Sequence, residues 1–383
     1  MSGAAPLGVY VHWPYCAKIC PYCDFNVFKA RGRQAEGVDL ARAIVADLEG
    51  QARLTGPREL VSIFFGGGTP SLMDPEVVGE IITTARRLWS PTAHVEVSLE
   101  ANPTDAEAAR FEALAAAGVN RLSLGLQALD DLSLKFLGRN HDADQARRAA
   151  GVAARVFPRL SLDMIYARPG QTVAAWAEEL RAVVGLGAEH LSPYQLTIET
   201  GTAFGRAVAR GTWAPPCEDL AADLYDITQT VLEAEGFEAY EVSNHARGKA
   251  ARSTHNLVYW RGQDYVGVGP GAHGRITTGG IRRATEALAK PGDYMAQVQM
   301  SGVGFAGGEA LSELERAEER LLSGLRILDG VAFEELAGLG LDSEHPKVRD
   351  LVDQRLLAPD PTRLRATADG RRVLDRLTRD LIL

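Results

Sequence analysis

Three of the four cysteines in this 383-residue chain lie within one short loop, Cys16-Ala-Lys-Ile-Cys20-Pro-Tyr-Cys23. Such a loop can bring three thiolates to one point, and soft thiolate ligands suit an iron-sulfur cluster or a zinc ion. Structural zinc sites usually close with four ligands, which come as two pairs far apart in the sequence. This chain has no second pair, because Cys217 stands alone. Three thiolates on a cluster of four irons leave one iron open to a small molecule, so the spacing favours a [4Fe-4S] cluster.

Two other interpretations of the cysteine loop stay open at this point. One is a zinc ion whose coordination is completed by His12 or Cys217. The other is a set of cysteines buried as small hydrophobic side chains. Prolines beside three closely spaced cysteines argue against a simple core segment.

Strand and helix patterns alternate through the first half of the chain. Helical periodicity predicts helices at about residues 37–54 and 74–89. Short apolar runs predict strands at residues 7–12, 60–65, 94–99, 119–124, 160–165 and 191–196. Six strand-helix units in this order imply an α/β fold whose parallel sheet is open or closed into part of a barrel.

Polar residues and glycines recur where these strands end. The cysteine loop follows the first strand and Gly66-Gly-Gly-Thr-Pro70 the second, while Glu100, Gln127 and Asp163 lie at or near the ends of the next three. Parallel α/β folds gather their chemistry at this edge of the sheet. Glycines there let backbone groups approach a charged amino-acid moiety. A tight strand-to-helix turn is the alternative for the glycine segment taken alone.

The second half of the chain divides into two kinds of segment. A helix over 220–231 and a strand over 238–243 precede an irregular, glycine-rich segment, 244–280, which contains His255-Asn-Leu-Val-Tyr-Trp260 and His273. This segment is either a functional loop facing a cavity or a surface loop anchored by its aromatic residues. From about residue 309 onward, helices at 311–328, 331–336, 351–357 and 373–377 with a hairpin at 363–370 predict a small α+β, winged-helix-like module. We therefore expect domains at 1–237, 238–305 (connecting segment) and 306–383.

Composition narrows the classes of partner and location. The net charge is -9 with a pI of about 5.5, and no basic stripe of the kind that binds nucleic acid stands out. No secretory signal or membrane span is expected, because the apolar run after the N-terminus is too short. Four cysteines make no disulfide framework, so a reducing, cytoplasmic location is expected.

The spacing C-x₃-C-x₂-C, with Tyr22 before the third cysteine, resembles the signature of the radical S-adenosylmethionine (SAM) family. This resemblance implies a [4Fe-4S] cluster whose open iron is chelated by SAM. Further motifs resemble the coproporphyrinogen III oxidase-like (HemN-like) branch, which joins a partial (βα)₆ barrel to a C-terminal accessory domain: Val9–Cys16, Phe65–Ser71, Arg121–Gln127, Leu137–His141, Asp163–Tyr166 and Pro169–Thr172.

The resemblance also implies a set of residues that contact SAM: Tyr10, Tyr22, Gly67, Gly68, Thr69, Glu100, Gln127, Arg139 and Asp163. Arg139 suits a bidentate pair with the SAM carboxylate, and Asp163 or Glu100 suits the ribose hydroxyls. Two positions depart from the branch pattern. Arg168 replaces an apolar residue, which changes the charge expected near Asp163, and Gly274 replaces a serine.

Two features separate the activities within this branch. The oxygen-independent coproporphyrinogen III oxidase has a fourth cysteine two residues after the third, where this chain has Phe25. The HemW-type heme chaperones have a His-Asn-x-x-Tyr-Trp motif, which His255–Trp260 matches. The resemblance therefore implies binding of heme and its delivery to a recipient hemoprotein, for example one at a respiratory membrane, without an assigned catalytic residue. The oxidase is the alternative.

Imidazole is a common axial ligand of heme iron. His255 is the first candidate for this role in the resemblance, and His245 and His273 are lesser candidates. The opposing interpretation of His255 is a structural histidine held by hydrogen bonds.

Overall fold

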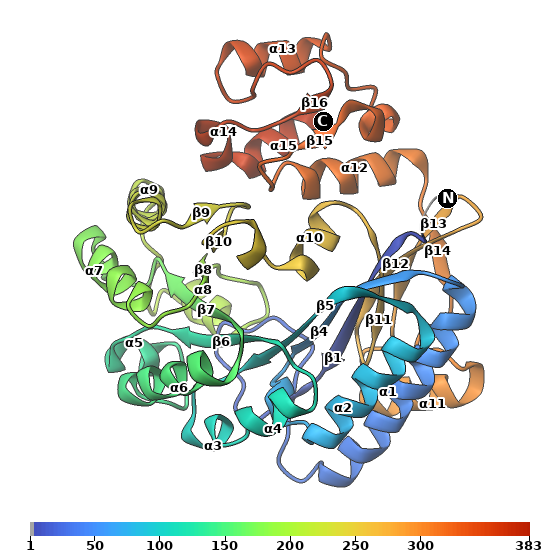
Figure 1. The fold of residues 1–383 in the computed structure, drawn as a ribbon. Helices are drawn as coiled ribbons and strands as arrows, with labels where there is room; N and C mark the ends of the chain where they lie inside the picture. The colour runs from blue at the N-terminus through green and yellow to red at the C-terminus, as the bar shows by residue number, and fades with distance from the viewer. Residues whose placement is uncertain (1–3) are drawn as a thin grey trace.

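The computed structural model describes residues 4–383, apart from the side chains of residues 105 and 106. Its described strands include one sheet of twelve, in the order β14-β13-β12-β11-β1-β4-β5-β6-β7-β8-β10-β9 (Figure 1). The six predicted strands are confirmed and pair in parallel with their neighbours: β1 (Pro6–Trp13), β4 (Glu59–Gly67), β5 (Ser90–Ala101), β6 (Arg121–Gln127), β7 (Arg159–Tyr166) and β8 (His190–Gln195). The α/β fold with a partial barrel is thereby shown.

Helices cover the outer face of this curved sheet (Figure 1). The longer ones are α1 (Gln34–Thr55), α2 (Pro75–Leu88), α6 (Ala143–Val156), α7 (Val173–Val184), α9 (Glu218–Ala234) and α11 (Pro291–Ser301). Shorter elements connect them: α3 (Asp105–Ala108), α4 (Phe111–Ala116), α5 (Asp131–Phe136), α8 (Ala203–Ala209), η1 (Pro70–Leu72) and η2 (Lys249–Ala251). The apolar faces of the longer helices and the outward side chains of the strands form the main hydrophobic core.

Each barrel strand presents a different chemistry to its two faces. Along β7, Leu160, Leu162 and Met164 belong to the main hydrophobic core, whereas Ser161 and Asp163 alternate with them and line an inner cavity. This alternation follows from the two-residue period of a strand. The barrel interior is therefore polar, and the sequence places hydroxyl and carboxyl groups there.

The segment 244–280 is not irregular, which corrects the prediction from sequence. It contains α10 (Thr254–Trp260) and, besides the short β10 described below, the strands β11 (Asp264–Val268) and β12 (His273–Thr278). Strand β11 pairs in parallel with β1, and β12, β13 (Ile281–Glu286) and β14 (Gly308–Ala310) continue the sheet in antiparallel fashion. At the opposite edge lie β10 (His245–Ala246) and β9 (Glu238–Ala239), so the predicted strand at 238–243 is much shorter.

The C-terminal part of the chain forms its own small core above α10 (Figure 1). Its elements are α12 (Glu313–Gly324), β15 (Val331–Ala332), η3 (Phe333–Leu339), α13 (Pro346–Asp353), β16 (Arg363–Leu364), α14 (Ala368–Arg372) and α15 (Leu374–Ile382). Residues 331–332, predicted to open a helix, instead form β15 and pair with β16. The predicted helix at 351–357 begins earlier, at Pro346, where proline suits the first helical turn.

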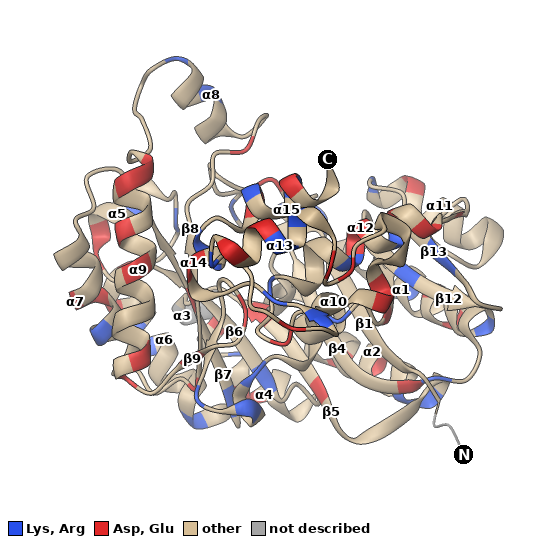
Figure 2. Ribbon diagram, turned by 90° about the horizontal axis from the view of Figure 1, so that it is seen from above, with Lys and Arg blue, Asp and Glu red and all other residues tan. Residues whose placement is uncertain are grey.

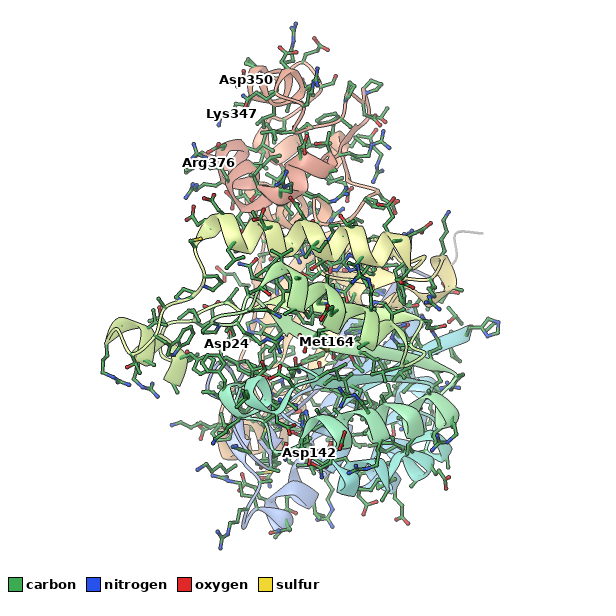
Figure 3. The ribbon with its side chains drawn as sticks, turned by 90° about the vertical axis from the view of Figure 1, so that its left-hand side faces the viewer. Asp24, Asp142, Met164, Lys347, Asp350 and Arg376 are labelled. Atoms are coloured by element: carbon green, nitrogen blue, oxygen red, sulfur yellow. The ribbon has the colours of Figure 1, made fainter. Side chains whose placement is uncertain are left out.

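Charges of both signs are interspersed over the elements of the molecule (Figure 2). On the C-terminal module, Lys347, Asp350 and Arg376 are exposed and carry opposite charges (Figure 3). Within residues 4–383, no helix combines the length and apolar character that crossing a membrane would require.

A buried carboxylate on β5 connects the barrel to α10. Glu96 accepts hydrogen bonds from the backbone N–H groups of Thr254 and His255, both at 3.0 Å, and pairs with Arg159 at 2.8 Å and Arg121 at 3.7 Å. Burial alone would raise the pKa of Glu96. The two arginines and the backbone N–H groups outweigh burial, so that pKa is lowered and the carboxylate stays charged.

Replacing Glu96 by Gln should destabilise the protein by about 3–5 kcal/mol, because Arg121 would keep a buried charge without its partner. The midpoint and slope of urea unfolding, followed by circular dichroism, measure this change. Glu49→Gln is the matched control: its pair with Arg87 is largely exposed, so the change should be about 0–1 kcal/mol. Equal effects of the two substitutions would contradict a structural role for the Glu96 cluster.

Candidate functional site

The cysteine loop follows β1, and backbone hydrogen bonds at its base, within it and to α8 hold it in place. Strand β2 (Tyr15–Cys16) pairs with β3 (Phe28–Lys29), which closes the loop at its base. Inside the loop, the N–H of Cys23 donates to the carbonyl of Cys20 at 3.2 Å, and the N–H of Phe204 on α8 donates to Pro21 at 2.9 Å. The loop is thus fixed by contacts that do not involve the thiols.

All three cysteines line one cavity of about 580 Å³, which we call the cysteine cavity. Eight of the nine residues predicted to contact SAM also line it: Tyr22, Gly67, Gly68, Thr69, Glu100, Gln127, Arg139 and Asp163. They come from the cysteine loop, from the ends of β4, β5 and β6, from the interior of β7 and, for Arg139, from the segment after α5. Two buried polar atoms on this wall, Arg139 Nε and Asp163 Oδ1, have no partner among the described residues. A donor and an acceptor are therefore left for a ligand.

The donor set fits a cluster better than a zinc ion. His12, one candidate fourth ligand, has both ring nitrogens engaged, with the Tyr10 hydroxyl at 3.0 Å and the Asn26 carbonyl at 2.9 Å. Cys217, the other candidate, is exposed before α9 and does not line the cysteine cavity. Among the described side chains, no group of three or more His, Cys, Asp or Glu is placed to hold a single metal ion.

The glycine turn after β4 holds the cysteine loop. The N–H groups of Gly68 and Thr69 donate to the carbonyls of Trp13 and Tyr15, at 2.7 and 2.9 Å. The N–H of Gly67 donates to Glu100 at 3.2 Å. These three N–H groups are therefore not available to a ligand. The prediction that the turn offers backbone groups to a ligand is limited to its carbonyl groups.

Two acids line the cavity from strands β5 and β7, which are separated by β6. Burial, followed by the nearby charge of Asp163, raises the pKa of Glu100 to about 8. Burial also raises the pKa of Asp163, although Ser123 donates a hydrogen bond to it at 2.8 Å. A pair of acids with raised pKa values on a cavity wall is typical of a binding or reaction site.

Arg139 reaches from the segment after α5 to the cysteine loop. It donates to Cys20 Sγ at 3.2 Å, to the Tyr22 hydroxyl at 3.3 Å and to the Gly125 carbonyl at 3.2 Å, and it also contacts Asn102. Its guanidinium thus places a positive charge beside the cysteine thiols. Asn102 was not predicted as a site residue.

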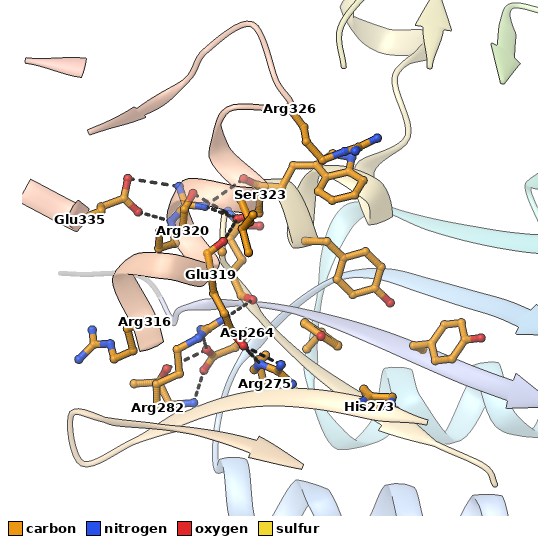
Figure 4. A pocket seen from close by; sticks show the side chains of 18 of the residues that line it. Asp264, His273, Arg275, Arg282, Arg316, Glu319, Arg320, Ser323, Arg326 and Glu335 are labelled. Carbon is orange, nitrogen blue, oxygen red and sulfur yellow. Dashed lines mark hydrogen bonds and ion pairs between the residues drawn. The ribbon is translucent and has the colours of Figure 1, made fainter. Parts of the chain in front are cut away.

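Tyr10 is the exception among the residues predicted to contact SAM. Its side chain lines a second cavity of about 1430 Å³, which we call the large cavity. Figure 4 shows this cavity from close by. This cavity lies between α10, β11–β13 and the C-terminal helices α12 and α15. The two cavities share two wall residues, Asp24 and Phe25, which directly follow Cys23.

His255 is buried inside the fold. The Ser62 hydroxyl lies 2.9 Å from its Nδ1, and the Tyr259 hydroxyl lies 2.8 Å from its Nε2. Tyr259 lies one helical turn after His255 on α10. Iron ligation by His255 would require one of these hydrogen bonds to break.

The two departures from the branch pattern are accommodated locally. Arg168 is buried and pairs with Glu179 on α7, and it does not line the cysteine cavity. The expectation that its charge acts near Asp163 is therefore not supported by this geometry. At Gly274, a Cβ would lie 2.5 Å from the Thr285 hydroxyl, so the usual serine would need Thr285 to move.

Several polar residues of the cavity wall were missed by the sequence analysis: Asn102, Ser123, Ser161, Ser192 and Tyr194. Most of them lie inside strands and not at strand ends. The signal was present, because polar residues recur with a two-residue period in β6, β7 and β8. The strand pairing brings these polar groups into rows across the sheet. Ser123 on β6 lies beside Ser161 on β7, and Asp163 on β7 lies beside Ser192 on β8.

Gly68→Ala should displace the cysteine loop and lower the iron content after anaerobic reconstitution. A Cβ at this position would lie 2.8 Å from the carbonyl oxygens of Trp13 and Tyr15, which are fixed backbone atoms. Gly292→Ala on α11 is the control, since its Cβ would meet no atom within 4 Å. Full iron content in Gly68→Ala, at the level of the control, would show that the turn does not position the loop.

Stability of the cluster-free protein should fall as the pH rises from about 5 to 8. Glu100 keeps its proton in the folded state up to a pKa of about 8 but ionises near 4.3 when unfolded, so the folded state binds more protons in this window. Water reaches Glu100 from the cavity, so we expect an effect of about 1–3 kcal/mol. Urea unfolding at several pH values measures it. Glu100→Gln should have a flatter slope, and an unchanged slope would contradict the assignment.

Comparison with known proteins identifies the family and the fold. A family model described as the radical SAM superfamily matches residues 10–183, and one described as the HemN C-terminal domain matches residues 311–373. The solved structure of coproporphyrinogen III oxidase (HemN) from Escherichia coli, a radical SAM enzyme, superposes with a TM-score of 0.81. It is 22% identical in sequence, and the match covers 99% of this chain and 90% of that one. At this identity the likeness supports the fold.

Two curated relatives match almost the full length. Radical S-adenosyl methionine domain-containing protein 1, mitochondrial, of Bos taurus is 41% identical over 392 residues, covering 99% of this chain and 88% of the relative. Heme chaperone HemW of Escherichia coli is 33% identical over 378 residues, covering 97% of both. This chain therefore belongs to the HemW-type family of the radical SAM superfamily.

Proposed function

We propose that this protein is a heme chaperone, which binds heme and delivers it to a recipient hemoprotein. The single observation that carries the proposal is the arrangement of two adjoining cavities, which share Asp24 and Phe25 after the third cysteine. One cavity has the thiols and polar groups for a cluster and SAM. The other has the size and aromatic walls for a large, flat cargo.

A [4Fe-4S] cluster on Cys16, Cys20 and Cys23 is proposed as the resident cofactor, with SAM as its exchangeable ligand. When bound, such a cluster supplies an open iron that the amino and carboxylate groups of SAM can chelate. Arg139 would hold the SAM carboxylate, because its buried Nε has no partner in the protein. The free oxygen of Asp163 and the protonated carboxyl of Glu100 suit the ribose hydroxyls.

The names of relatives support the chaperone over the oxidase. The full-length bacterial relatives are named heme chaperones, whereas the oxidase shares the fold at 22% identity. Phe25 stands where the oxidase branch has its fourth cysteine, and its side chain is 61% exposed. We expect binding and delivery of heme in place of catalytic turnover.

Partners and location follow from the same proposal. The recipient is a hemoprotein, for example one at a respiratory membrane, and the mixed charges of the surface do not favour nucleic acid (Figure 2). All four cysteines are free, and a reducing cytoplasm would keep them ready to hold a cluster. We also propose the division into residues 1–237, 238–305 and 306–383, in which the middle segment extends the barrel sheet through β11–β13.

Anaerobic reconstitution followed by two parallel assays should separate the chaperone from the oxidase. We expect about four irons per chain, saturable heme binding seen in difference absorption spectra, and no conversion of coproporphyrinogen III to protoporphyrinogen IX. Cys20→Ala should lose the cluster, whereas Cys217→Ala should keep it. SAM-dependent decarboxylation well above the level of the Cys20→Ala protein would overturn the chaperone and establish the oxidase.

A further inference from the structure

The large cavity has an aromatic wall built from elements that are far apart in sequence. Its apolar lining residues include Tyr10, Phe25, Tyr259, Trp260, Tyr265 and Leu322. Tyr259 and Tyr265 pack edge to face with ring centroids 4.5 Å apart, and a hydrogen bond between the Tyr259 hydroxyl and His255 Nε2 fixes the Tyr259 ring. Rigid aromatic side chains of this kind suit a flat apolar ligand such as a porphyrin.

Only one histidine offers a free ring to this cavity among the described residues. Of the eight histidines, His12, His190 and His255 have both ring nitrogens hydrogen-bonded. His141 and His245 are buried, and His94 and His345 line neither cavity. His273, at the start of β12, is exposed, lines the large cavity and points into it (Figure 4).

The cavity also contains an unpaired cation. Arg275, Arg282 and Arg320 pair with Glu319, Asp264 and Glu335 (Figure 4). Within the described part of the chain, the Arg316 guanidinium has no hydrogen bond or ion pair, and it lines the same cavity. It is therefore the arginine available to a carboxylate of a ligand.

Hydrogen bonds connect the segment after the cysteine loop to the strands that line the large cavity. Asn26, three residues after Cys23, donates hydrogen bonds to the carbonyls of Pro270 at 2.9 Å and Ala289 at 2.7 Å. These carbonyls flank β12 and β13, so the loop that follows the cysteines is fixed to the segment that carries His273. A ligand in the large cavity would thus contact Phe25, which also lines the cysteine cavity.

From these contacts we propose that the large cavity is the heme site, with His273 as the axial ligand and Arg316 as the partner of a propionate. This inference rests on the proposed function and adds where the cargo sits. The imidazole of His255 then serves the site indirectly, because it holds Tyr259 in the wall. The His-Asn-x-x-Tyr-Trp motif contributes aromatic surface through its last two residues.

Heme titration of the reconstituted full-length protein, followed by difference spectra against the heme-free sample, tests the ligand. His273→Ala should weaken heme binding by about tenfold or more and shift the Soret band, and added imidazole should restore the wild-type band position. His94→Ala is the matched control, an exposed histidine outside both cavities, and should behave as wild type. His255→Ala should keep the wild-type band position in the protein that remains folded.

The outcomes separate this inference from the proposed function. A wild-type protein that binds no heme would overturn both. Heme binding with an unchanged Soret band in His273→Ala would overturn His273 as the ligand and leave the chaperone intact. A shifted band in His255→Ala with none in His273→Ala would return the ligand to the buried histidine.

The role of Arg316 as a propionate partner is tested by comparing heme with heme dimethyl ester. Arg316→Ala should weaken heme binding by about two- to fivefold but leave binding of heme dimethyl ester unchanged, because the ester lacks the propionate charges. Arg349→Ala, an exposed arginine of the C-terminal module outside the cavity, is the control. Equal losses for heme and its ester, or no loss for either, would remove Arg316 from the site.

Discussion

The buried carboxylate of Glu96 is the contact on which both cavities depend. It lies on the third barrel strand, balances the charges of Arg121 and Arg159 on the next two strands, and binds the first N–H groups of α10. A charge in this position is tolerated because paired arginines and backbone donors replace the water it has lost. Since α10 carries His255 and Tyr259, the same carboxylate positions the wall of the large cavity.

A polar barrel interior follows from the same principle. The inward side chains of β5 to β8 include Glu100, Ser123, Asp163 and Ser192, which lie in adjacent rows of the sheet. These side chains meet only part of one another's hydrogen-bonding capacity. Asp163 Oδ1, for example, has no hydrogen-bond partner in the part of the chain that the structure describes. Incomplete satisfaction inside a protein is costly, so it is retained where a ligand completes the network.

The cysteine loop is the element shared by the two sites. Its cysteines face the barrel interior, and the residues just after them, Asp24 to Asn26, line or support the large cavity. A phenylalanine here, in place of a further thiol, gives the shared wall an apolar, exposed ring. One short segment therefore connects the wall of the cysteine cavity with the wall of the large cavity.

The sequence alone determined the local features of this protein. The six barrel strands, the loop of three cysteines and most of the residues that line the cavity with it were predictable, because strand periodicity and the residues at strand ends are local signals. The place of residues 244–280 was decided only by tertiary structure. Strand β11 is short and lies in a glycine-rich segment, and it becomes a strand because it pairs with the free edge of β1 some 250 residues away. For the same reason, the burial of His255 and the exposure of His273 could not be read from their neighbours in sequence: one faces Ser62 on β4, and the other opens onto a cavity that forms only when the C-terminal helices close over the sheet.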